Sequence, residues 1–532
     1  MSDNVPVLIA GAGPVGMVSA LLLARHGVPS VVLESQSERV AVGSRSICVQ
    51  GDVLDILERI GLGAQVADAG VTWLRGRTYY REHQVLEITF PDQVDSAFPP
   101  FVNIPQSVVE LMIEERVQAE PLITLRRGHE VIGVAQDADG VRVSTSMDRD
   151  FTGSHLIAAD GPRSAVRRLL DLSFDGMSFD DKFLIADIRA DLGFAAPERR
   201  FYFDPAWNPG RQVLLHPQPG GVWRIDWQVP ADFDLAVEER TGGLDDRVRQ
   251  ITGEIPYEIV WMSVYRFHQR RVPTMVVGKV LLAGDSAHVM SPFGARGLNS
   301  GISDADNAVW KVVLDRTGQA GPGLLASYDA ERGAAADENL RVTGETMRFL
   351  VPQTDADRER RSDVLTRSVD DPSARREIDS GRLAEPYFYI DSPLTTSNGD
   401  DGEFPRQPGV ARPPVPGVLC PDARLSWGMR LRELVATRFV LLTHWCDWQP
   451  ADRWESELIG QPVPLGEVEE DEVLVDALRL KPRSAVLVRP DGHIAAVLTE
   501  PPGGIGALVT DALRRATGWD DGGGGGAGPP TT

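Results

Sequence analysis

A glycine-rich turn near the start of the chain has the residue types and spacing of a nucleotide phosphate site. It lies between an apolar run at 5–10 and an apolar-rich stretch at 17–25, and it comprises Gly11, Ala12, Gly13, Pro14, Val15 and Gly16. Gly11 permits a tight turn, Gly13 lets the backbone approach a pyrophosphate, and Gly16 lets the following helix pack against the strand. The turn therefore predicts a bound dinucleotide, although the same pattern also occurs in turns without a ligand.

Glu34 ends the second expected strand, at 30–34. A carboxylate at this distance from the glycine turn meets the ribose hydroxyls of an adenosine, and it disfavours a 2′-phosphate. Because NAD and FAD share the ADP half, the turn and Glu34 together do not separate these two cofactors.

A second group of residues favours a flavin. The strand expected at 278–283 runs into Gly284 and Asp285, and a glycine-rich loop then enters a helix expected at 298–314. An aspartate at the carboxyl end of a strand is suited to binding a polyol hydroxyl. Free backbone N–H groups at a helix start face developing negative charge, which a reduced flavin carries at N1 and C2=O.

Three motifs, in this order, resemble the single-component, class A FAD-dependent aromatic hydroxylases, which include para-hydroxybenzoate hydroxylase. They are GAGPVG at 11–16, AADGPRSAVRR at 158–168 and LLAGDSAHVMSPFGARGLNSGISDADNAVWK at 281–311. The chain is most similar to the branch of phenol hydroxylase, 3-(3-hydroxyphenyl)propionate hydroxylase and aromatic polyketide hydroxylases. This resemblance implies an α/β fold in which a Rossmann-like FAD-binding domain carries an inserted β-sheet substrate domain and a C-terminal thioredoxin-like domain.

The resemblance also implies which residues hold FAD. The glycine turn holds the pyrophosphate, Glu34 the adenosine ribose, and Arg45 lies near the phosphates. Gln106 resembles the polar residue that opens a helix beside the ribityl chain. Asp160 resembles the Asp-Gly aspartate linked to FAD and NAD(P)H, with a plain turn aspartate as the alternative. The third motif supplies the rest: Gly284 and Asp285 at the ribityl chain, Pro292 beside the flavin ring, and Gly297, Leu298 and Asn299 at its pyrimidine edge.

Arg296 departs from the family pattern, because many relatives carry Gly-Gln-Gly where this chain has Ala295, Arg296 and Gly297. A guanidinium adds a fixed charge and more donors than an amide. Arg296 favours an anionic flavin or substrate if it faces the site. If it points to solvent or joins a structural ion pair, it has no such role.

The resemblance implies an enzyme in which NADH or NADPH reduces FAD, and a flavin C4a-hydroperoxide then transfers oxygen to a phenolic or polycyclic aromatic ring. The sequence does not separate NADH from NADPH. Three alternatives stay open: a flavin-dependent dehydrogenase or reductase that inserts no oxygen, a flavin-dependent halogenase, and a flavoprotein that binds FAD without turnover. The spacing of Trp223 and Trp227, four residues apart rather than two, disfavours the halogenase.

The β-rich stretch is expected to supply the substrate site. Strand alternation at 222–229 puts Trp223 on one face with Ile225 and Trp227, and it puts Arg224, Asp226 and Gln228 on the other. The tryptophan face is either a pocket wall or core. Tyr202 and His216 are candidate partners of a phenol hydroxyl or merely structural, and Pro292 is expected beside flavin and substrate alike. His288 is expected to pack, and no catalytic base can be named.

Changes of pattern along the chain predict the domains. The FAD-binding domain is expected at 1–182, with 73–100 contributing to the substrate domain, and again at 273–390 with a helical extension. The other segments are a β-rich substrate domain at 183–272, a linker at 391–416, a thioredoxin-like domain at 417–519 and a flexible tail at 520–532. The thioredoxin-like domain has no Cys-x-x-Cys, so a packing role or a homodimer interface is expected of it rather than redox chemistry.

Composition excludes several classes of partner. The 532 residues carry a formal net charge of −23, which disfavours nucleic acid and anionic membranes. No apolar run is long enough to span a bilayer, and the amino terminus has no signal pattern, so we expect a cytoplasmic protein. The three cysteines are scattered, and neither a disulfide framework nor a metal site is predicted.

Overall fold

The computed structural model describes residues 5–39, 46–90, 96–381, 383–399, 402, 404, 410, 412–435, 437–466 and 471–519. Arg45 and the expected tail at 520–532 lie outside these residues.

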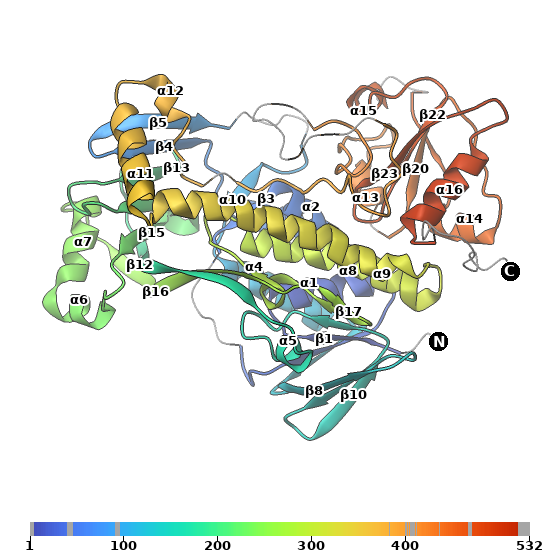
Figure 1. The fold of residues 1–532 in the computed structure, drawn as a ribbon, viewed down its shortest axis with the longest axis horizontal. Coiled ribbons are helices and arrows are strands. Elements are labelled where there is room, and N and C mark those ends of the chain that lie inside the picture. The colour runs from blue at the N-terminus through green and yellow to red at the C-terminus, as the bar shows by residue number, and fades with distance from the viewer. Residues whose placement is uncertain are drawn as a thin grey trace.

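A six-stranded sheet forms the centre of the nucleotide-motif region (Figure 1). Neighbouring strands are parallel except the first pair, and the order is β17 (Val276–Val277), β18 (Val280–Leu282), β11 (Leu156–Ala158), β1 (Val7–Ala10), β2 (Ser30–Glu34) and β7 (Ile123–Arg127). β1, β11 and β18 are buried apolar runs, as expected of parallel strands with both faces covered. Ala10, Ala158 and Leu282 lie side by side at their carboxyl ends, so the residues that follow share one edge of the sheet.

Helices from three parts of the sequence pack around this sheet. α1 (Pro14–Arg25) contacts both α4 (Gln106–Ala119) and α8 (Gly297–Thr317), and α8 also contacts α2 (Gly51–Glu58). The helix expected at 298–314 is therefore confirmed. α3 (Gly63–Ala69) follows α2. A small antiparallel sheet of β8 (Val131–Gln136), β9 (Val141–Thr145) and β10 (Arg149–Gly153) precedes β11, and α5 (Ala165–Leu169) follows it.

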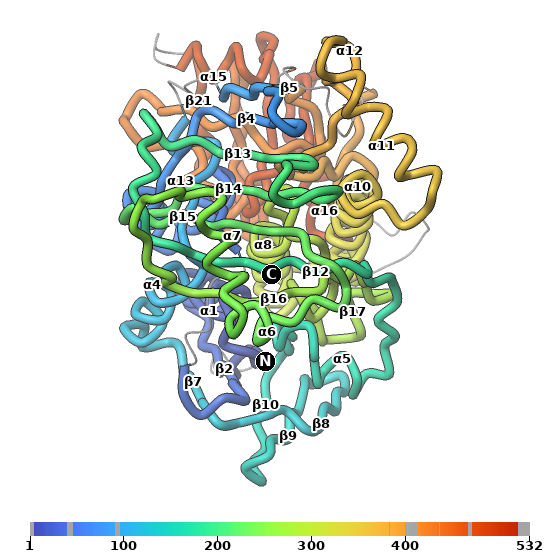
Figure 2. Tube along the Cα trace, turned by 90° about the vertical axis from the view of Figure 1, so that its left-hand side faces the viewer, coloured from blue at the N-terminus to red at the C-terminus, as the bar shows by residue number. Residues whose placement is uncertain are grey.

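An eight-stranded sheet forms the second large element. Its order is β19 (His288–Val289), β16 (Glu258–Arg271), β12 (Asp175–Arg189), β15 (Val222–Val229), β14 (Gln212–Gln218), β13 (Glu198–Phe203), β4 (Arg75–Tyr80) and β5 (His83–Thr89). Neighbours are antiparallel except β13 and β4. In Figure 2 the blue β4 and β5 lie beside the green β13, so an early segment of the chain completes a sheet built from later strands. β3 (Cys48–Gln50) and β6 (Phe101–Asn103), which precede and follow β4 and β5 in sequence, form a two-stranded antiparallel sheet.

The two faces of the eight-stranded sheet have different coverings. Trp223, Ile225 and Trp227 pack in an apolar cluster with Leu244 and Val248 of α7 (Gly243–Thr252), which follows α6 (Leu235–Thr241). Figure 1 shows these two helices at the left-hand edge of the molecule. The opposite face of the sheet turns toward the nucleotide motifs.

A run of helices follows α8. α9 (Gly323–Tyr328) leads through a π-helical turn, η3 (Asp329–Gly333), into α10 (Ala334–Leu350), which crosses the middle of Figure 1. α11 (Asp355–Arg367) and α12 (Pro372–Arg375) then pack near β13, where Phe203 contacts Phe349 of α10.

The carboxyl-terminal region has its own four-stranded sheet, drawn in orange and red at the right of Figure 1. The order is β21 (Val463–Pro464), β20 (Val440–His444), β22 (Ser484–Val488) and β23 (Ile494–Thr499). The helices around it are α13 (Leu431–Leu434), α14 (Arg453–Ile459), α15 (Glu472–Ala477) and α16 (Gly506–Ala516).

Buried charges join this region to the rest of the chain. Arg489, just after β22, donates to both carboxylate oxygens of Glu331 in η3, at 2.5 and 2.8 Å, and Lys311 of α8 donates to Glu331 at 2.7 Å. All three side chains are fully buried. Removing one partner from such a set leaves an uncompensated buried charge, so the contact disfavours separation of the two regions.

The described residues contain neither a membrane-spanning helix nor a metal-binding cluster. No helix in the ranges given above is long and apolar enough to cross a membrane. Within the same ranges no three side chains of His, Cys, Asp or Glu gather in a way that would hold a metal ion. Cys48, Cys420 and Cys446 are free thiols.

Candidate active site

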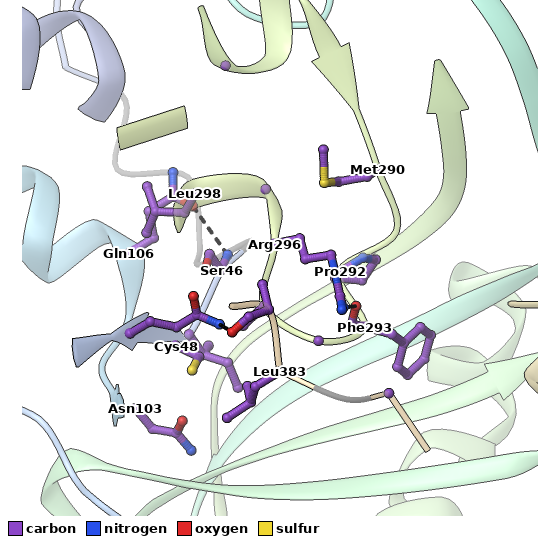
Figure 3. Close-up of a pocket in the computed structure, with 18 of the residues that line it drawn as sticks. Ser46, Cys48, Asn103, Gln106, Met290, Pro292, Phe293, Arg296, Leu298 and Leu383 are labelled. Atoms are coloured by element: carbon purple, nitrogen blue, oxygen red, sulfur yellow. Dashed lines mark hydrogen bonds between the residues drawn. The ribbon is translucent and has the colours of Figure 1, made fainter. Parts of the chain in front are cut away.

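A cavity of about 1770 Å³ lies between the carboxyl edge of the six-stranded sheet and one face of the eight-stranded sheet. It brings together residues that are up to 419 positions apart in sequence, from Gly13 to Arg432. The predicted residues that line it are Gly13, Pro14, Val15, Gln106, Asp160, His216, Gly284, Asp285, Pro292, Gly297 and Leu298. Figure 3 shows part of this lining, with Pro292, Phe293 and Arg296 on one loop.

The glycine turn after β1 leaves room where a phosphate would lie. Gly11 has φ of 97°, and a Cβ there would collide with the backbone of Ala159. A Cβ at Gly16 would collide with the carbonyl of Gly11, so the helix and strand approach too closely for a side chain. A Cβ at Gly13 would meet nothing within 4 Å, and Gly13 lines the cavity.

Glu34 stands beside this turn at the end of β2. One carboxylate oxygen accepts a hydrogen bond from the N–H of Ala12 at 2.8 Å, and the other accepts one from the N–H of Gln36 at 2.8 Å. The side chain is therefore held at the edge of the sheet next to the turn, where the sequence predicts a ribose contact. Gly11, Ala12, Gly16 and Glu34 do not themselves line the cavity.

Asp160 follows β11, and only one of its two carboxylate oxygens accepts hydrogen bonds from the described residues. Oδ2 accepts hydrogen bonds from the N–H groups of Ala165 and Val166, at 2.7 and 3.1 Å, and so caps the start of α5. Oδ1 is buried and has no partner among the described residues. An orphaned acceptor that lines a cavity is a site for a ligand hydroxyl or N–H.

A buried carboxylate, that of Asp304, holds the turn after β18 in place through hydrogen bonds. Asp304 of α8 accepts hydrogen bonds from Gly284 N–H at 2.9 Å, from His288 Nε2 at 2.7 Å and from Arg332 Nε at 2.6 Å. Burial favours the protonated form of Asp304, but the charges of Arg332 and His288 lower its pKa to about 2. The turn η2 (Gly284–Ser286) is thereby held, with Asp285 half-buried on the cavity wall. His288 has the packing role that the sequence predicts.

The amino end of α8 opens onto the cavity through Gly297 and Leu298. A Cβ at Gly297 would meet nothing within 4 Å. The first N–H groups of a helix have no intrahelical acceptor, and the helix dipole makes this end positive. Asn299 does not line the cavity. Its Oδ1 accepts from Gln50 N–H at 3.0 Å, and its Nδ2 donates to Cys48 C=O at 3.0 Å, so this side chain ties α8 to β3.

Arg296 does not point to solvent. The residue is only 2% exposed, and it lines the cavity. Its Nε donates to Asn339 Oδ1 of α10 at 3.1 Å, and Nη1 donates to Phe293 C=O at 3.3 Å. Ala295 has φ of 56°, a left-handed conformation that favours glycine. The solvent-exposed alternative is therefore wrong, and a fixed positive charge lies beside the loop that carries Pro292.

Gln106 occupies the first position of α4 and lines the cavity. Its Oε1 accepts from Ser46 N–H at 3.2 Å, a contact drawn in Figure 3, and its Nε2 donates to Glu110 at 2.7 Å. Arg45 lies outside the described residues, so its predicted place near the phosphates stays a prediction.

The eight-stranded sheet presents its polar face to the cavity, so of the two alternatives for the tryptophan face the core is correct, and the candidate substrate contacts of Trp223 and Tyr202 are wrong. Trp223 packs edge-on to Phe194 in the apolar cluster on the far face. Tyr202 stacks on Tyr79 and packs against the same cluster. Neither Trp223 nor Tyr202 lines the cavity, whereas His216 does. The reason is that α6 and α7 cover the tryptophan face.

The sequence interpretation missed the charged residues of this cavity wall: Arg199, Arg224 and Asp226. Arg224 makes two hydrogen bonds to Asp187, each of 2.7 Å, with both side chains buried. Arg199 donates to Ser380 C=O at 2.6 Å. The sequence signal for these residues was the alternation of charged and polar residues with apolar ones in β15. Buried charges on one face of a sheet need either hydrogen-bond and ion-pair partners or a ligand.

Burial changes the pKa values of two side chains on this cavity wall, Asp226 and His216. Burial raises the pKa of Asp226 to about 7, against the opposing effect of Arg224. Burial, together with the charges of Arg199 and Arg224, lowers the pKa of His216 well below its ordinary value, so the imidazole is neutral at pH 7. A carboxyl group that titrates near neutrality in a cleft is a candidate for proton transfer.

These features suit FAD. The open space at Gly13, the orphaned Asp160 Oδ1 and the amino ends of α1 and α8 face one cavity. Residues 4–343 match the family model described as FAD binding domain. The chain belongs to this FAD-binding family. It is 30% identical over 520 residues to anhydrotetracycline monooxygenase of Streptomyces rimosus, a match that covers 92% of this chain and 94% of that protein.

Two further matches extend the comparison. The chain is 30% identical over 354 residues to 3-(3-hydroxy-phenyl)propionate/3-hydroxycinnamic acid hydroxylase of Mycobacterium sp. (strain JLS), which covers 65% of this chain and 60% of the hydroxylase. The crystal structure of the flavin-dependent monooxygenase PieE in complex with FAD and substrate has the same fold, with a TM-score of 0.82, 24% identity, and coverage of 96% of this chain and 99% of that one. This member of the family is an FAD-dependent enzyme.

Proposed function

We propose that the protein is a monooxygenase that uses FAD, NAD(P)H and O2 to hydroxylate a phenolic ring, and that its substrate is polycyclic. The observation that carries this proposal is the single cavity of about 1770 Å³ that joins the flavin motifs to a charged sheet face. Pockets for one small ligand measure roughly 300–1,000 Å³, so there is room for a second large molecule beside FAD. The match to anhydrotetracycline monooxygenase along 92% of the chain supports a polycyclic substrate.

Bound FAD would supply the redox chemistry, namely hydride acceptance from NAD(P)H and activation of O2 for insertion of one oxygen atom. The protein binds and orients the cofactor. We assign the pyrophosphate to the turn at Gly13, the adenosine ribose to Glu34, and the ribityl chain to Asp285, with Gln106 and Asp160 nearby. The N–H groups of Gly297 and Leu298 stabilise negative charge on the reduced ring, and buried Arg296 adds to that stabilisation.

The substrate is held in the half of the cavity that the sheet lines. The apolar side chains of the sheet in this half of the cavity include Phe183, Ile185 and Leu214. They exclude water and contact the flat rings of the substrate. Pro292 lines the cavity, and we assign it to the boundary between the flavin half and this half. A dry, apolar site favours oxygen transfer to the ring over release of reduced oxygen into water.

Several basic residues support access for NAD(P)H. The cavity lining contains Asp160 together with five basic or imidazole side chains, Arg163, Arg167, Arg266, His268 and Arg270. In a chain of net charge −23, this concentration of positive charge attracts a diphosphate.

The sheets support the domain organisation that we propose. Residues 1–182 and 273–390 form the FAD-binding domain, 183–272 the inserted substrate domain to which 73–100 contribute, and 417–519 a thioredoxin-like domain after a linker at 391–416. The buried contact of Arg489 with Glu331 supports a packing role for the carboxyl-terminal domain. A homodimer and a cytoplasmic location complete the proposal.

A substrate panel tests this function. The purified FAD-loaded protein is mixed with NADH or NADPH and with simple phenols, 3-hydroxyphenylpropionate, hydroxyanthraquinones or anhydrotetracycline, and product mass is measured. We expect faster NAD(P)H oxidation, together with a product heavier by one oxygen atom, for a polycyclic phenol. Reduction or dehydrogenation of the substrate without added oxygen would support the dehydrogenase alternative instead.

The assignment of Asp285 has its own test. Asp285→Ala removes a carboxylate that we place on a ribityl hydroxyl, so FAD affinity should fall by about 10- to 100-fold, as expected for a lost charge-assisted hydrogen bond. The control is Asp139→Ala, an exposed turn aspartate. Flavin absorbance after gel filtration is the measurement, and equal flavin content in both variants would contradict the assignment.

A further inference from the structure

Asp226 lies on the cavity face of β15 between two apolar residues. Its register neighbours are Ile185 on β12 and Leu214 on β14, and both of these side chains also line the cavity. The residue is half-buried, and it belongs to the cavity lining itself. The apolar neighbours offer no hydrogen bonds to a carboxylate in this position. The Asp226 side chain therefore faces a ligand bound in the cavity.

Asp226 lacks the partners that other buried acids in this sheet have. Oδ1 is buried and has no hydrogen bond within the described part of the chain. Asp187, one register row away, holds Arg224 through two hydrogen bonds. Asp181 accepts from Gln228 Nε2 at 2.7 Å and from Arg211 Nε at 3.1 Å. An unpaired, buried carboxylate oxygen costs folding stability, and this cost is smaller when the carboxyl group is protonated. The position therefore favours a carboxyl group that takes up and releases a proton.

A row of charged groups lies next to Asp226 across the sheet. Arg224 pairs with His216 on β14 and with Asp187 on β12 in the strand register. Arg224 is neutralised by Asp187, and Arg199 and Arg224 are the cations whose charges act on Asp226. His216 is uncharged at neutral pH. The groups that face Asp226 and bear on its titration are therefore Arg199, Arg224, Asp187 and His216.

We propose that Asp226 is the catalytic base that removes the proton from a ring hydroxyl of the substrate. This inference rests on the proposed function, because it requires a phenolic substrate. The O–H bond of the substrate breaks, and the proton passes to the Asp226 carboxylate. The electron pair stays on the phenolic oxygen and is delocalised into the ring, whose ortho and para carbons become more nucleophilic. After product release the proton returns to water through the cavity.

Arg199 stabilises the resulting phenolate. It is a buried guanidinium on the same cavity wall, it donates a hydrogen bond to the neutral Ser380 C=O, and Asp226 is one of the acids whose charge acts on it. A cation beside a developing anion in a dry site is worth more than the same pair in water. The base and the cation thus act on one hydroxyl group.

A comparison of pH profiles tests Asp226. Turnover by the FAD-loaded wild-type protein, Asp226→Asn and Asp226→Glu is measured from about pH 5 to about pH 9 with the panel compound that the wild type hydroxylates fastest. Wild-type turnover should rise through about pH 7, where the carboxyl ionises, and then level off. Asp226→Asn should be about 10²- to 10⁴-fold slower near neutral pH. Its rate should keep rising with pH, because solvent then ionises the phenol.

The control is Asp181→Asn, which makes the same chemical change at a partnered aspartate outside the cavity lining. It should keep the wild-type pH profile, and Asp226→Glu should recover part of the lost rate. If Asp226→Asn is slowed by one factor at every pH, or keeps the wild-type rise, Asp226 is not the base. If the wild type hydroxylates no phenol in the panel, the proposed function fails.

A stability measurement needs no substrate. The pKa of Asp226 is raised to about 7 from its ordinary 3.8, so the folded protein retains a proton that the unfolded chain has lost between about pH 4 and about pH 7. The contribution of this group to stability therefore falls as pH rises through that window. Asp226→Asn avoids this loss, and its advantage in urea midpoint over the wild type should grow across the window and then level off. An advantage that does not change with pH would show a satisfied carboxylate and would overturn the inference.

Discussion

The two faces of β15 carry opposite chemistry on neighbouring residues of one strand. Ile225 and Trp227 are fully buried and pack against the helical cover at α7. Arg224 and Asp226 alternate with them and line the cavity. The packed face stabilises the sheet by burial of apolar surface, whereas the cavity face buries charges at a cost in stability. This difference indicates that the polar face is the functional one, because only a ligand site explains that cost.

Arg224→Leu should give the largest loss of stability on the cavity face. It leaves Asp187 buried without its cation, and breaking such a pair costs about 3–5 kcal/mol. Urea denaturation measures the effect. The double variant Arg224→Leu with Asp187→Leu should recover most of the loss, since two apolar residues replace the pair. A single variant with unchanged stability would show that the pair contributes nothing to the fold.

Ile225→Val, at the adjacent position, should have a smaller effect of another kind. The loss of one methylene from the packed face costs about 0.5–1.5 kcal/mol. Flavin content and turnover should equal those of the wild type, because the side chain points away from the cavity. A folded Ile225→Val protein with altered turnover would break the distinction between the two faces.

Tyr202→Phe should have the smallest effect. Tyr202 stacks on Tyr79 on the packed side, and loss of its hydroxyl removes at most one hydrogen bond, worth about 1 kcal/mol or less. Steady-state turnover should stay within about twofold of the wild type, which is far below the effect of losing a general base. A large fall in turnover would indicate that Tyr202 binds the phenol hydroxyl.

Much of the flavin half could be predicted from the sequence because its signals are local. A glycine turn after an apolar strand, an acid at the end of the next strand and a Gly-Asp pair before a helix each depend on a few neighbouring residues. The parallel register of Ala10, Ala158 and Leu282 then brings them to one edge. The burial of Arg296 was not predictable, because it depends on Asn339 of α10, which is 43 residues away.

The substrate half could not be predicted to the same depth because it depends on contacts between distant segments. The alternation in β15 correctly predicted which residues share each face of the strand. It did not predict which face is covered by helices and which lines the cavity. The helices that cover the tryptophan face are polar in sequence, with Leu244 and Val248 as their fully buried apolar residues, so they gave little indication of that role. The sequence predicts that 73–100 contribute to the substrate domain, but the pairing of β4 with β13, more than a hundred residues later, does not follow from local sequence.

The most direct test of the account is a turnover experiment under isotopically labelled O2 with the FAD-loaded protein, NAD(P)H and the best phenol of the panel. The account predicts a hydroxylated product that carries one labelled oxygen atom, with about one NAD(P)H oxidised for each product formed. An unlabelled product, or NAD(P)H oxidation that changes the substrate without adding labelled oxygen, would contradict it.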